Sequence, residues 1–369
     1  MRLDEACIKR EKDLAFFVTQ GLMNAAIQAN VDALGFETAF RALDKYISHN
    51  AKWCVTTASQ VVGRDAKGVD GLLSLLHWYN DLCYRGSMNY GSGEDGCLEL
   101  ELKGCRATGI YPLICEWFCR REFIFMCDES NPELALELEK SLPKGDELCR
   151  WSISRRDGKL VTEKMIPFQD LGIPSAPIET MDYYAQAGAG EFFAMATACL
   201  VGSMGPEKAL KLLIRNAMRF GEEFGAYFIM KHKKSGPEAA EEAMQLLDSL
   251  LQMKAEVTHL DESGLECQIN ACPFADSPIE ICHQIEAFKT AAARVISPHT
   301  EFSYKEEKGD KVCHWTMQIV RPPDEERPRP EPPKADPLER LMNRLIDGEI
   351  SEEEFERKMV LLKKHMPTK

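Results

Sequence analysis

The residues of this 369-residue chain with the clearest potential for chemistry are three cysteines and two histidines in its second half. Cys272, Cys282 and Cys313 are widely spaced, and the last two are each followed by a histidine, His283 and His314. If the three sulfur atoms meet in the folded protein, three thiolates and the His314 imidazole form a tetrahedral donor set for zinc, or they serve as ligands of an iron–sulfur cluster. The first hypothesis is therefore a metal site built from Cys272, Cys282, Cys313 and His314.

A nucleophilic thiolate is the second hypothesis for the same residues. Cys282 is expected near the start of a helix, where the helix dipole lowers the pKa of a thiol, and His283 or His314 would act as the base. Attack on an electron-poor C=N or C=O carbon would then open a small cyclic molecule. A third interpretation is that the cysteines only fill the core, because Cys is among the most frequently buried residue types. The sequence leaves these three alternatives open.

The expected strand geometry restricts both chemical hypotheses. Cys313 and His314 are neighbours in a segment with the pattern of a strand, so their side chains are expected on opposite faces. Only one of the two can then face a given pocket. The restriction is weaker for Cys282 and His283, because neighbours on a helix are only about 100° apart around the axis.

The spacing of the three cysteines occurs a second time, earlier in the chain. Cys105 and Cys115 are ten positions apart, as are Cys272 and Cys282, and the gap from Cys115 to Cys149 is 34 positions against 31 in the second copy. The closing segments are also similar, with the sequences GDELCRWSI and GDKVCHWTM. The first copy has no histidine beside these cysteines, so an activity is expected in the second copy.

The hydrophobic pattern of each copy predicts helices followed by a small antiparallel sheet. Amphipathic helices are expected from Gly71 in the first copy and from Ala243 in the second. Strand-like alternation follows in both, over residues 97–102 and 265–269. The sequence therefore predicts an α+β fold of two tandem repeats, and the packing of the repeats is expected to leave a cleft between them, which is a favoured place for a pocket.

Composition shifts and prolines divide the chain into five expected segments. The stretch 182–190, with DYY and AGAG, is expected to be a flexible lead-in to the second repeat. The segments are a first repeat 1–153, a linker 154–181, a second repeat 182–320, a proline-rich linker 321–337 and a C-terminal helical hairpin 338–369.

The C-terminal segments have the most distinctive local patterns. Residues 321–337 contain seven prolines and are expected to form an extended spacer. In the hairpin, Gly348 ends the first helix, and Ser351 and Glu354 form a capping box for the second. A hairpin this small cannot bury both of its faces, so we expect it to dock on the body of the protein, on another protein or on a second copy of the chain.

The duplicated part resembles the family that contains L-2-amino-thiazoline-4-carboxylic acid hydrolase. The similarity is carried by the helical lead-in, by the strand that ends at Cys272-Pro273, by the pair Cys282-His283 and by the closing Cys313-His314-Trp315. It covers most of residues 190–320 and, more weakly, 15–153. The resemblance implies hydrolysis of a C–N bond in a small cyclic amidine. A non-catalytic module that binds a small ligand or a metal is the alternative.

The C-terminal hairpin resembles the short C-terminal domain called SHOCT. The matching residues are Leu338, Leu341, Gly348, Glu349, Ile350, Ser351, Glu353, Glu354 and Phe355. Such tails serve association, so the resemblance implies a binding role for the hairpin and no chemistry.

Composition limits the partners and the compartment. With 59 acidic and 45 basic residues the formal charge is −14, which argues against nucleic acid and against an anionic membrane surface. The N-terminus lacks the apolar region of a signal peptide, and the stretch EFFAMATACLVGSM is shorter than the roughly 18 residues of a spanning helix. The 14 cysteines suit thiols in a reducing compartment. We expect a cytoplasmic protein that acts on a small nitrogen- or sulfur-containing molecule, such as a cyclic amidine or amide.

Overall fold

The structure is a computed structural model in which the chain divides into two compact units, Met1–Val320 and Arg321–Lys369. The division falls at the start of the predicted proline-rich linker 321–337, which lies outside the described residues. The structure describes residues 11–63, 65–84, 86–93, 97–105, 112–159, 178–261, 264–275, 277–307, 312–319, 351 and 354.

The first half of the larger unit has three helices followed by an antiparallel sheet against which a fourth helix packs. Its strands are arranged in the order β1-β2-β4-β3. The elements are α1 (Glu11–Leu34), α2 (Phe36–Val62), α3 (Gly68–Tyr79), a π-helical turn (Asn80–Tyr84), β1 (Ser87–Ser92), β2 (Leu98–Lys103), α4 (Pro112–Ser130), β3 (Leu134–Lys140), a 3-10 turn (Leu142–Lys144) and β4 (Cys149–Arg155).

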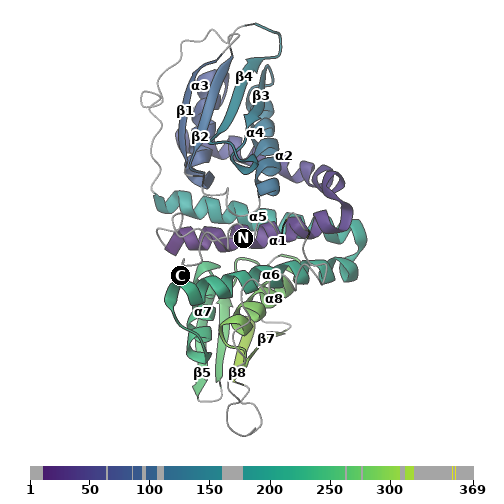
Figure 1. The fold of residues 1–369 in the computed structure, drawn as a ribbon, viewed down its shortest axis with the longest axis vertical. Coiled ribbons are helices and arrows are strands. Elements are labelled where there is room, and N and C mark those ends of the chain that lie inside the picture. The colour runs from purple at the N-terminus through teal and green to yellow at the C-terminus, as the bar shows by residue number, and fades with distance from the viewer. Residues whose placement is uncertain are drawn as a thin grey trace, which may run out of the picture. The chain divides into compact units, whose positions relative to one another are not determined.

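The second half has the same order of helices and strands (Figure 1). Its sheet is also antiparallel, with the corresponding strand order β5-β6-β8-β7. The predicted α+β class is therefore confirmed, with one four-stranded sheet in each half of the described chain. The elements are α5 (Ile178–Met204), α6 (Pro206–His232), α7 (Pro237–Leu250), β5 (Lys254–Asp261), β6 (Gly264–Ala271), α8 (Ile279–Ile296), β7 (Thr300–Glu307) and β8 (Val312–Ile319).

A single glycine separates the first two helices of each half. Gly35 between α1 and α2 has φ 74°, and Gly205 between α5 and α6 has φ 84°. Each glycine N–H closes the preceding helix, onto Val31 O at 2.9 Å and Val201 O at 2.9 Å respectively. Only glycine adopts this backbone conformation without strain, so it permits an abrupt change of direction between two long helices.

Side chains alternate between the two faces along the two central strands of each sheet. One face of each sheet therefore packs into a core. Trp151 of β4 lies opposite Leu100 of β2, and Trp315 of β8 lies opposite Cys267 of β6. All four side chains are buried. Bulky residues at alternate positions therefore face the helices, as the period-2 pattern of the sequence predicts.

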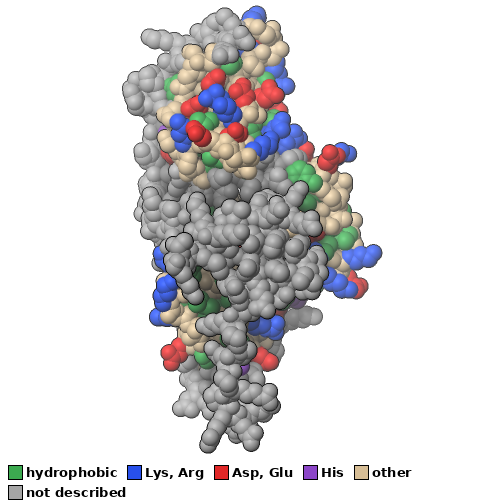
Figure 2. Space-filling model, viewed as in Figure 1, with side chains coloured by type: hydrophobic (Ala, Val, Ile, Leu, Met, Phe, Trp, Pro, Cys, Tyr) green, Lys and Arg blue, Asp and Glu red, His purple; other side chains and the backbone are tan. Residues whose placement is uncertain are grey.

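The opposite face of the first-half sheet is charged. Arg150 of β4 donates a hydrogen bond to Glu101 at 2.8 Å and lies 3.6 Å from Glu99, both on the neighbouring β2. Figure 2 shows basic and acidic side chains interspersed over the described surface near this sheet. Such alternation of sign is typical of a solvated sheet face.

The first helix of the chain contributes to the core of the second half. Side chains of α1 belong to the same buried cluster as those of α5, α6, α7, α8 and the second sheet. Asn30 of α1 donates a hydrogen bond from Nδ2 to the carbonyl oxygen of Ala196 in α5 at 2.9 Å, and Arg215 of α6 pairs with Asp32 at 2.7 Å. The predicted repeat 1–153 is therefore tied to the second repeat through its first helix.

The helix α5 corrects one expectation from the sequence. It begins at Ile178, so the stretch 182–190 is helical and the predicted flexible lead-in is wrong. By length and apolar composition alone, and with Glu191 included, Tyr183–Met204 is also long enough to cross a membrane. Helices of compact proteins can meet the same requirement. Figure 1 shows α5 lying along α1, and the buried side chains of α5 belong to the same core cluster as those of α1.

Two residues of the predicted hairpin are described, and they make the expected capping contact. The backbone N–H of Glu354 donates to Ser351 Oγ at 3.2 Å. The rest of the hairpin 338–369 lies outside the described residues.

Candidate functional site

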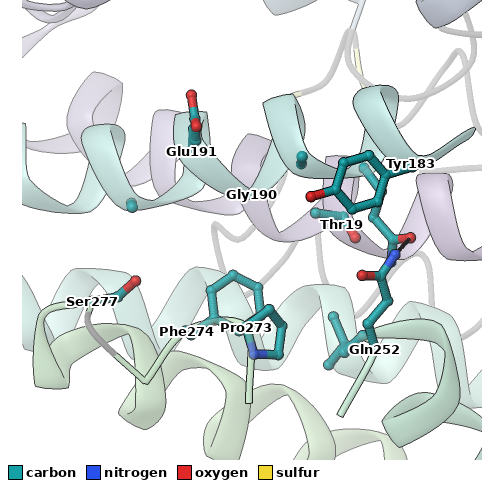
Figure 3. A pocket seen from close by; sticks show the side chains of 12 residues that line it. Thr19, Tyr183, Gly190, Glu191, Gln252, Pro273, Phe274 and Ser277 are labelled. Atoms are coloured by element: carbon teal, nitrogen blue, oxygen red, sulfur yellow. Dashed lines mark hydrogen bonds between the residues drawn. The ribbon is translucent and has the colours of Figure 1, made fainter. Parts of the chain in front are cut away.

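A cavity of about 320 Å³ lies where α1 meets the second half of the protein (Figure 3). Its volume lies at the lower end of the range of about 300–1,000 Å³ that is usual for small-molecule sites. Parts of the chain that are far apart in sequence form its walls: α1, α5, the turn after α7 and the loop after β6. The lining residues are Thr19, Tyr183, Gln186, Ala187, Gly190, Glu191, Ala194, Leu251, Gln252, Pro273, Phe274 and Ser277.

Small residues of α5 make room for the cavity. Ala187, Gly190 and Ala194 recur at helical spacing on the side of α5 that lines it. A Cβ atom at Gly190 would be 3.7 Å from the Phe274 ring, in van der Waals contact, whereas a Cβ atom at Gly188 would have nothing within 4 Å. The volume of the side chain at residue 190 therefore controls the space in the cavity.

The loop after β6 contributes an apolar wall. Phe274 is 7% exposed and meets the ring of Phe193 of α5 edge-on, with ring centroids 6.0 Å apart. The loop is held by backbone hydrogen bonds, from Ala275 N to Cys272 O at 3.2 Å and from Ser277 N to Phe274 O at 2.9 Å. This wall is preformed, because its shape is set by contacts inside the loop and with α5.

Two glutamines form the polar wall. Gln186 of α5 donates a hydrogen bond from Nε2 to the carbonyl oxygen of Leu250, and Gln252 donates from Nε2 to Gln186 Oε1. The two side chains thus connect α5 to the turn that follows α7. Figure 3 shows Gln252 rising toward α5 beside Thr19, with Pro273 and Phe274 to one side.

Glu191 is the charged residue among the described lining residues. Its side chain is exposed and points away from Pro273 and Phe274 (Figure 3). Neither lysine, arginine nor histidine lines the cavity within the described part of the chain. The interior therefore offers hydrogen-bonding and aromatic groups without a fixed positive charge.

The first and third predicted cysteines of the second half come close to each other. Cys272 follows β6, and Cys313 lies in β8 opposite Ile269, three residues before Cys272. Both pack against the hydrophobic core. Burial raises the pKa of the Cys272 thiol; its hydrogen bond from Phe274 N opposes this effect, and the charge of nearby Cys313 adds to it. Cys272 is therefore suited to packing and poorly suited to act as a thiolate.

The second predicted cysteine has the expected place at a helix start. Cys282 is the fourth residue of α8 and is half-buried. His283, the next residue, has a side chain 43% exposed, with Nδ1 3.7 Å from Glu286 Oε2. Ser277, two residues before the start of α8, lines the cavity, but Cys272, Cys282 and Cys313 are not among the described lining residues.

The predicted separation of Cys313 and His314 is found. Cys313, Trp315 and Met317 alternate along β8, with Trp315 and Met317 buried in the core. His314 lies between them, opposite Gln268 of β6 and Lys305 of β7. It therefore belongs to the other face of the sheet and does not join Cys313 on the core side.

The predicted metal site gains no support from this arrangement. Within the described residues, no group of three or more histidine, cysteine, aspartate or glutamate side chains lies close enough to hold a metal ion. Zinc or an iron–sulfur cluster at Cys272, Cys282, Cys313 and His314 stays a prediction.

In the first half, Cys105 and Cys149 lie at the same places in the fold as Cys272 and Cys313 in the second half. Cys149 begins β4 opposite Leu102, which is three residues before Cys105. Both thiols pack against the core of the first half, and Cys149 Sγ accepts a hydrogen bond from Leu142 N at 3.4 Å. The side chain of Cys115 is not described. The same arrangement without histidines agrees with a packing role for the first and third cysteines in both halves.

Sequence reasoning missed a buried ion pair in the second half. Lys289 of α8 pairs with Asp248 of α7, and their side chains are 0% and 3% exposed. Trp315 Nε1 donates to the second oxygen of Asp248 at 2.9 Å, and the Lys289 ammonium lies 5.4 Å from the centre of the Trp315 ring. A signal was present: Lys289 is four residues after Ile285, on the apolar face of the α8 pattern.

The cavity residues were also missed, because Thr19, Tyr183, Gln252 and Phe274 form no pattern along the sequence. Comparison with known proteins adds no assignment: no family model, no curated protein and no solved structure matches the chain. The two family resemblances remain predictions.

Proposed function

We propose that this protein binds a small, partly planar organic molecule in the cavity between α1, α5 and the loop after β6. The observation that carries the proposal is a preformed space of about 320 Å³ with an aromatic wall at Phe274 and a polar wall at Gln186 and Gln252. Polar groups that converge beside an aromatic surface are common in small-molecule sites. The cavity also joins distant parts of the chain, with Thr19 of α1 beside residues of α5 and of the loop after β6.

Hydrolysis of a C–N bond in a bound cyclic amide or amidine is the second candidate function. The supporting observation is that Cys282 lies in the first turn of α8, and Ser277, just before that helix, lines the cavity. A cysteine at a helix start is ionised to the nucleophilic thiolate more readily, because the helix dipole favours the negative charge. In this proposal His283 is the candidate base, because His314 lies on the other face of the sheet. The base takes the proton of Cys282, the thiolate attacks the ring carbon, and the C–N bond breaks as the leaving nitrogen takes up that proton. Water then hydrolyses the covalent intermediate and releases the thiol.

A pair of glycines in α5 allows a controlled test of binding. Gly190→Leu fills the cavity beside Phe274, whereas Gly188→Leu introduces the same side chain at a position with open space around the Cβ atom. Both changes remove a helix glycine, which favours the helix by about 0.8–1 kcal/mol, so neither variant is expected to lose its fold. The probe is benzamide, a small planar molecule, with binding to the full chain followed by saturation-transfer NMR and calorimetry.

The expected result is binding to the native chain and to Gly188→Leu and at least a tenfold loss in Gly190→Leu. Binding that is equal in both variants, or absent in the native chain, would contradict the proposed site. Turnover is tested separately with cyclic amides and amidines: the hydrolase candidate requires product formation that Cys282→Ala abolishes without loss of binding.

A further inference from the structure

The position of Gln252 in the backbone is unusual for its residue type. The N–H of Gln252 bonds Ser249 O at 3.0 Å and that of Met253 bonds Asp248 O at 2.8 Å, the two hydrogen bonds of a Schellman motif at the end of α7. The residue at this place has a left-handed backbone, here with φ 57°, and is usually glycine. Glutamine is less stable than glycine there, because its Cβ atom crowds the backbone.

The side chain of Gln252 is exposed where it borders the cavity, and a hydrogen bond to α5 holds it there. One of its N–H groups donates to Gln186 Oε1, and Gln186 is itself fixed by donating to Leu250 O. The left-handed turn starts the side chain in the direction of α5, and the hydrogen bond to Gln186 keeps it there. A flexible side chain that is fixed before a ligand arrives loses little freedom on binding.

Two hydrogen-bonding groups of the Gln252 amide remain available to a ligand. Within the described part of the chain, its second N–H and its carbonyl oxygen make no hydrogen bond to other residues. A donor and an acceptor side by side are complementary to a carboxamide edge, in which an N–H also lies beside a C=O.

We propose that Gln252 is the specificity-determining residue of this cavity and that the ligand is an uncharged planar molecule with a carboxamide-type edge. The inference rests on the proposed binding function and names the ligand class for the same site. Gln252 pairs with the edge of the ligand, and Pro273 and Phe274 contact its flat face.

The charges around the cavity support an uncharged ligand. The described lining has no cationic side chain to compensate a carboxylate, and burying an unpaired anion is strongly unfavourable. The Glu191 carboxylate points away from the aromatic wall, so it does not supply a partner for a cation bound against Phe274. Molecules with polar but neutral edges therefore fit the interior best.

Three probes of nearly the same shape test the ligand class: benzamide is neutral, benzoate is an anion and benzamidine is a cation. Binding of each to the full native chain is measured by calorimetry, and we expect benzamide to bind at least tenfold more tightly than either ion. Equal affinities, or a preference for an ion, would overturn the proposed class while leaving the proposed binding function intact. Absence of binding for all three would instead contradict the binding function itself.

Two variants test the role of Gln252. Gln252→Gly removes the side chain and its backbone strain. We therefore expect a higher unfolding temperature together with a roughly tenfold to hundredfold weaker affinity for benzamide, about the contribution of two hydrogen bonds. Gln252→Glu keeps the size but replaces the donor with a charged acceptor, and it should lower the affinity for benzamide further. Unchanged affinity for benzamide in both variants would show that Gln252 does not bind the ligand and does not determine specificity.

Discussion

The two halves of the protein share a chain path but differ in how they satisfy the buried polar groups around their tryptophans. In the second half, Trp315 donates to Asp248, which pairs with Lys289. In the first half, Trp151 is 1% exposed, and its Nε1 has no hydrogen-bond partner among the described residues. Both tryptophans follow a cysteine at the start of the last strand by two positions, so the same place in the fold carries two different polar environments.

The helix that packs on each sheet, α4 in the first half and α8 in the second, carries a buried charge of opposite sign at the same position. Lys289 is seven residues after Cys282, and Glu122 is seven residues after Cys115. Both are completely buried. Glu122 accepts a hydrogen bond from Asn50 Nδ2 of α2 at 2.6 Å. This fold therefore accepts a buried charge of either sign at this helix position when a local partner is present.

Removing the buried negative charge of Asp248 in the second half should have the largest effect on stability. Asp248→Asn keeps the size of the side chain but leaves the Lys289 ammonium buried without its ion-pair partner. Loss of one partner of a buried pair costs about 3–5 kcal/mol, which urea unfolding of the full chain followed by circular dichroism would measure. The double variant Asp248→Leu with Lys289→Met should recover most of this loss. A loss below about 1 kcal/mol in Asp248→Asn would show that the pair contributes little.

The two tryptophans provide a matched comparison with a smaller effect. Trp315→Phe and Trp151→Phe remove the same atoms, but only Trp315 loses a hydrogen bond to a charged group among the described residues. The loss of unfolding free energy should therefore be larger for Trp315→Phe by about 1.5–3 kcal/mol. Equal losses in the two variants would contradict the different environments described for the halves.

Buried thiols should make both halves less stable at alkaline pH. Burial raises the pKa of Cys127 in α4 and of Cys267 in β6 to about 12, with Asp128 and Asp248 respectively adding to the effect. The unfolded chain releases these protons near its ordinary thiol pKa, so the stabilisation is complete below that pKa and is lost as the pH rises toward 12. Each thiol should lower the unfolding free energy by about 1 kcal/mol between pH 9 and pH 10.

The matched variants for this prediction are Cys127→Ala in the first half and Cys267→Ala in the second. Each should reduce the slope of unfolding free energy against pH, by similar amounts because both thiols are fully buried. A slope that neither variant changes would assign the alkaline loss to other groups.

Several features of the fold could be predicted from the sequence because they depend on neighbours along the chain. Alternation of polar and apolar residues predicted β2 and β6, and it also predicted that His314 and Cys313 lie on opposite sides of β8. The position of Cys282 in the first turn of α8 follows from local pattern as well. The lead-in at 182–190 was mispredicted, since its glycines suggested flexibility whereas packing of α5 against α1 favours a helix there.

The sequence by itself determined the α+β class, the repeated spacing of the cysteines and the residues on each face of the strands, because these follow from short-range periodicity. Only the tertiary structure decided that Thr19, Gln186, Gln252 and Phe274 surround one cavity, and that Lys289 meets Asp248 beside Trp315. The physical reason is that these contacts join segments tens to hundreds of residues apart. Their geometry is set by the packing of α1, α5, α7 and α8 as a whole, which no local pattern encodes.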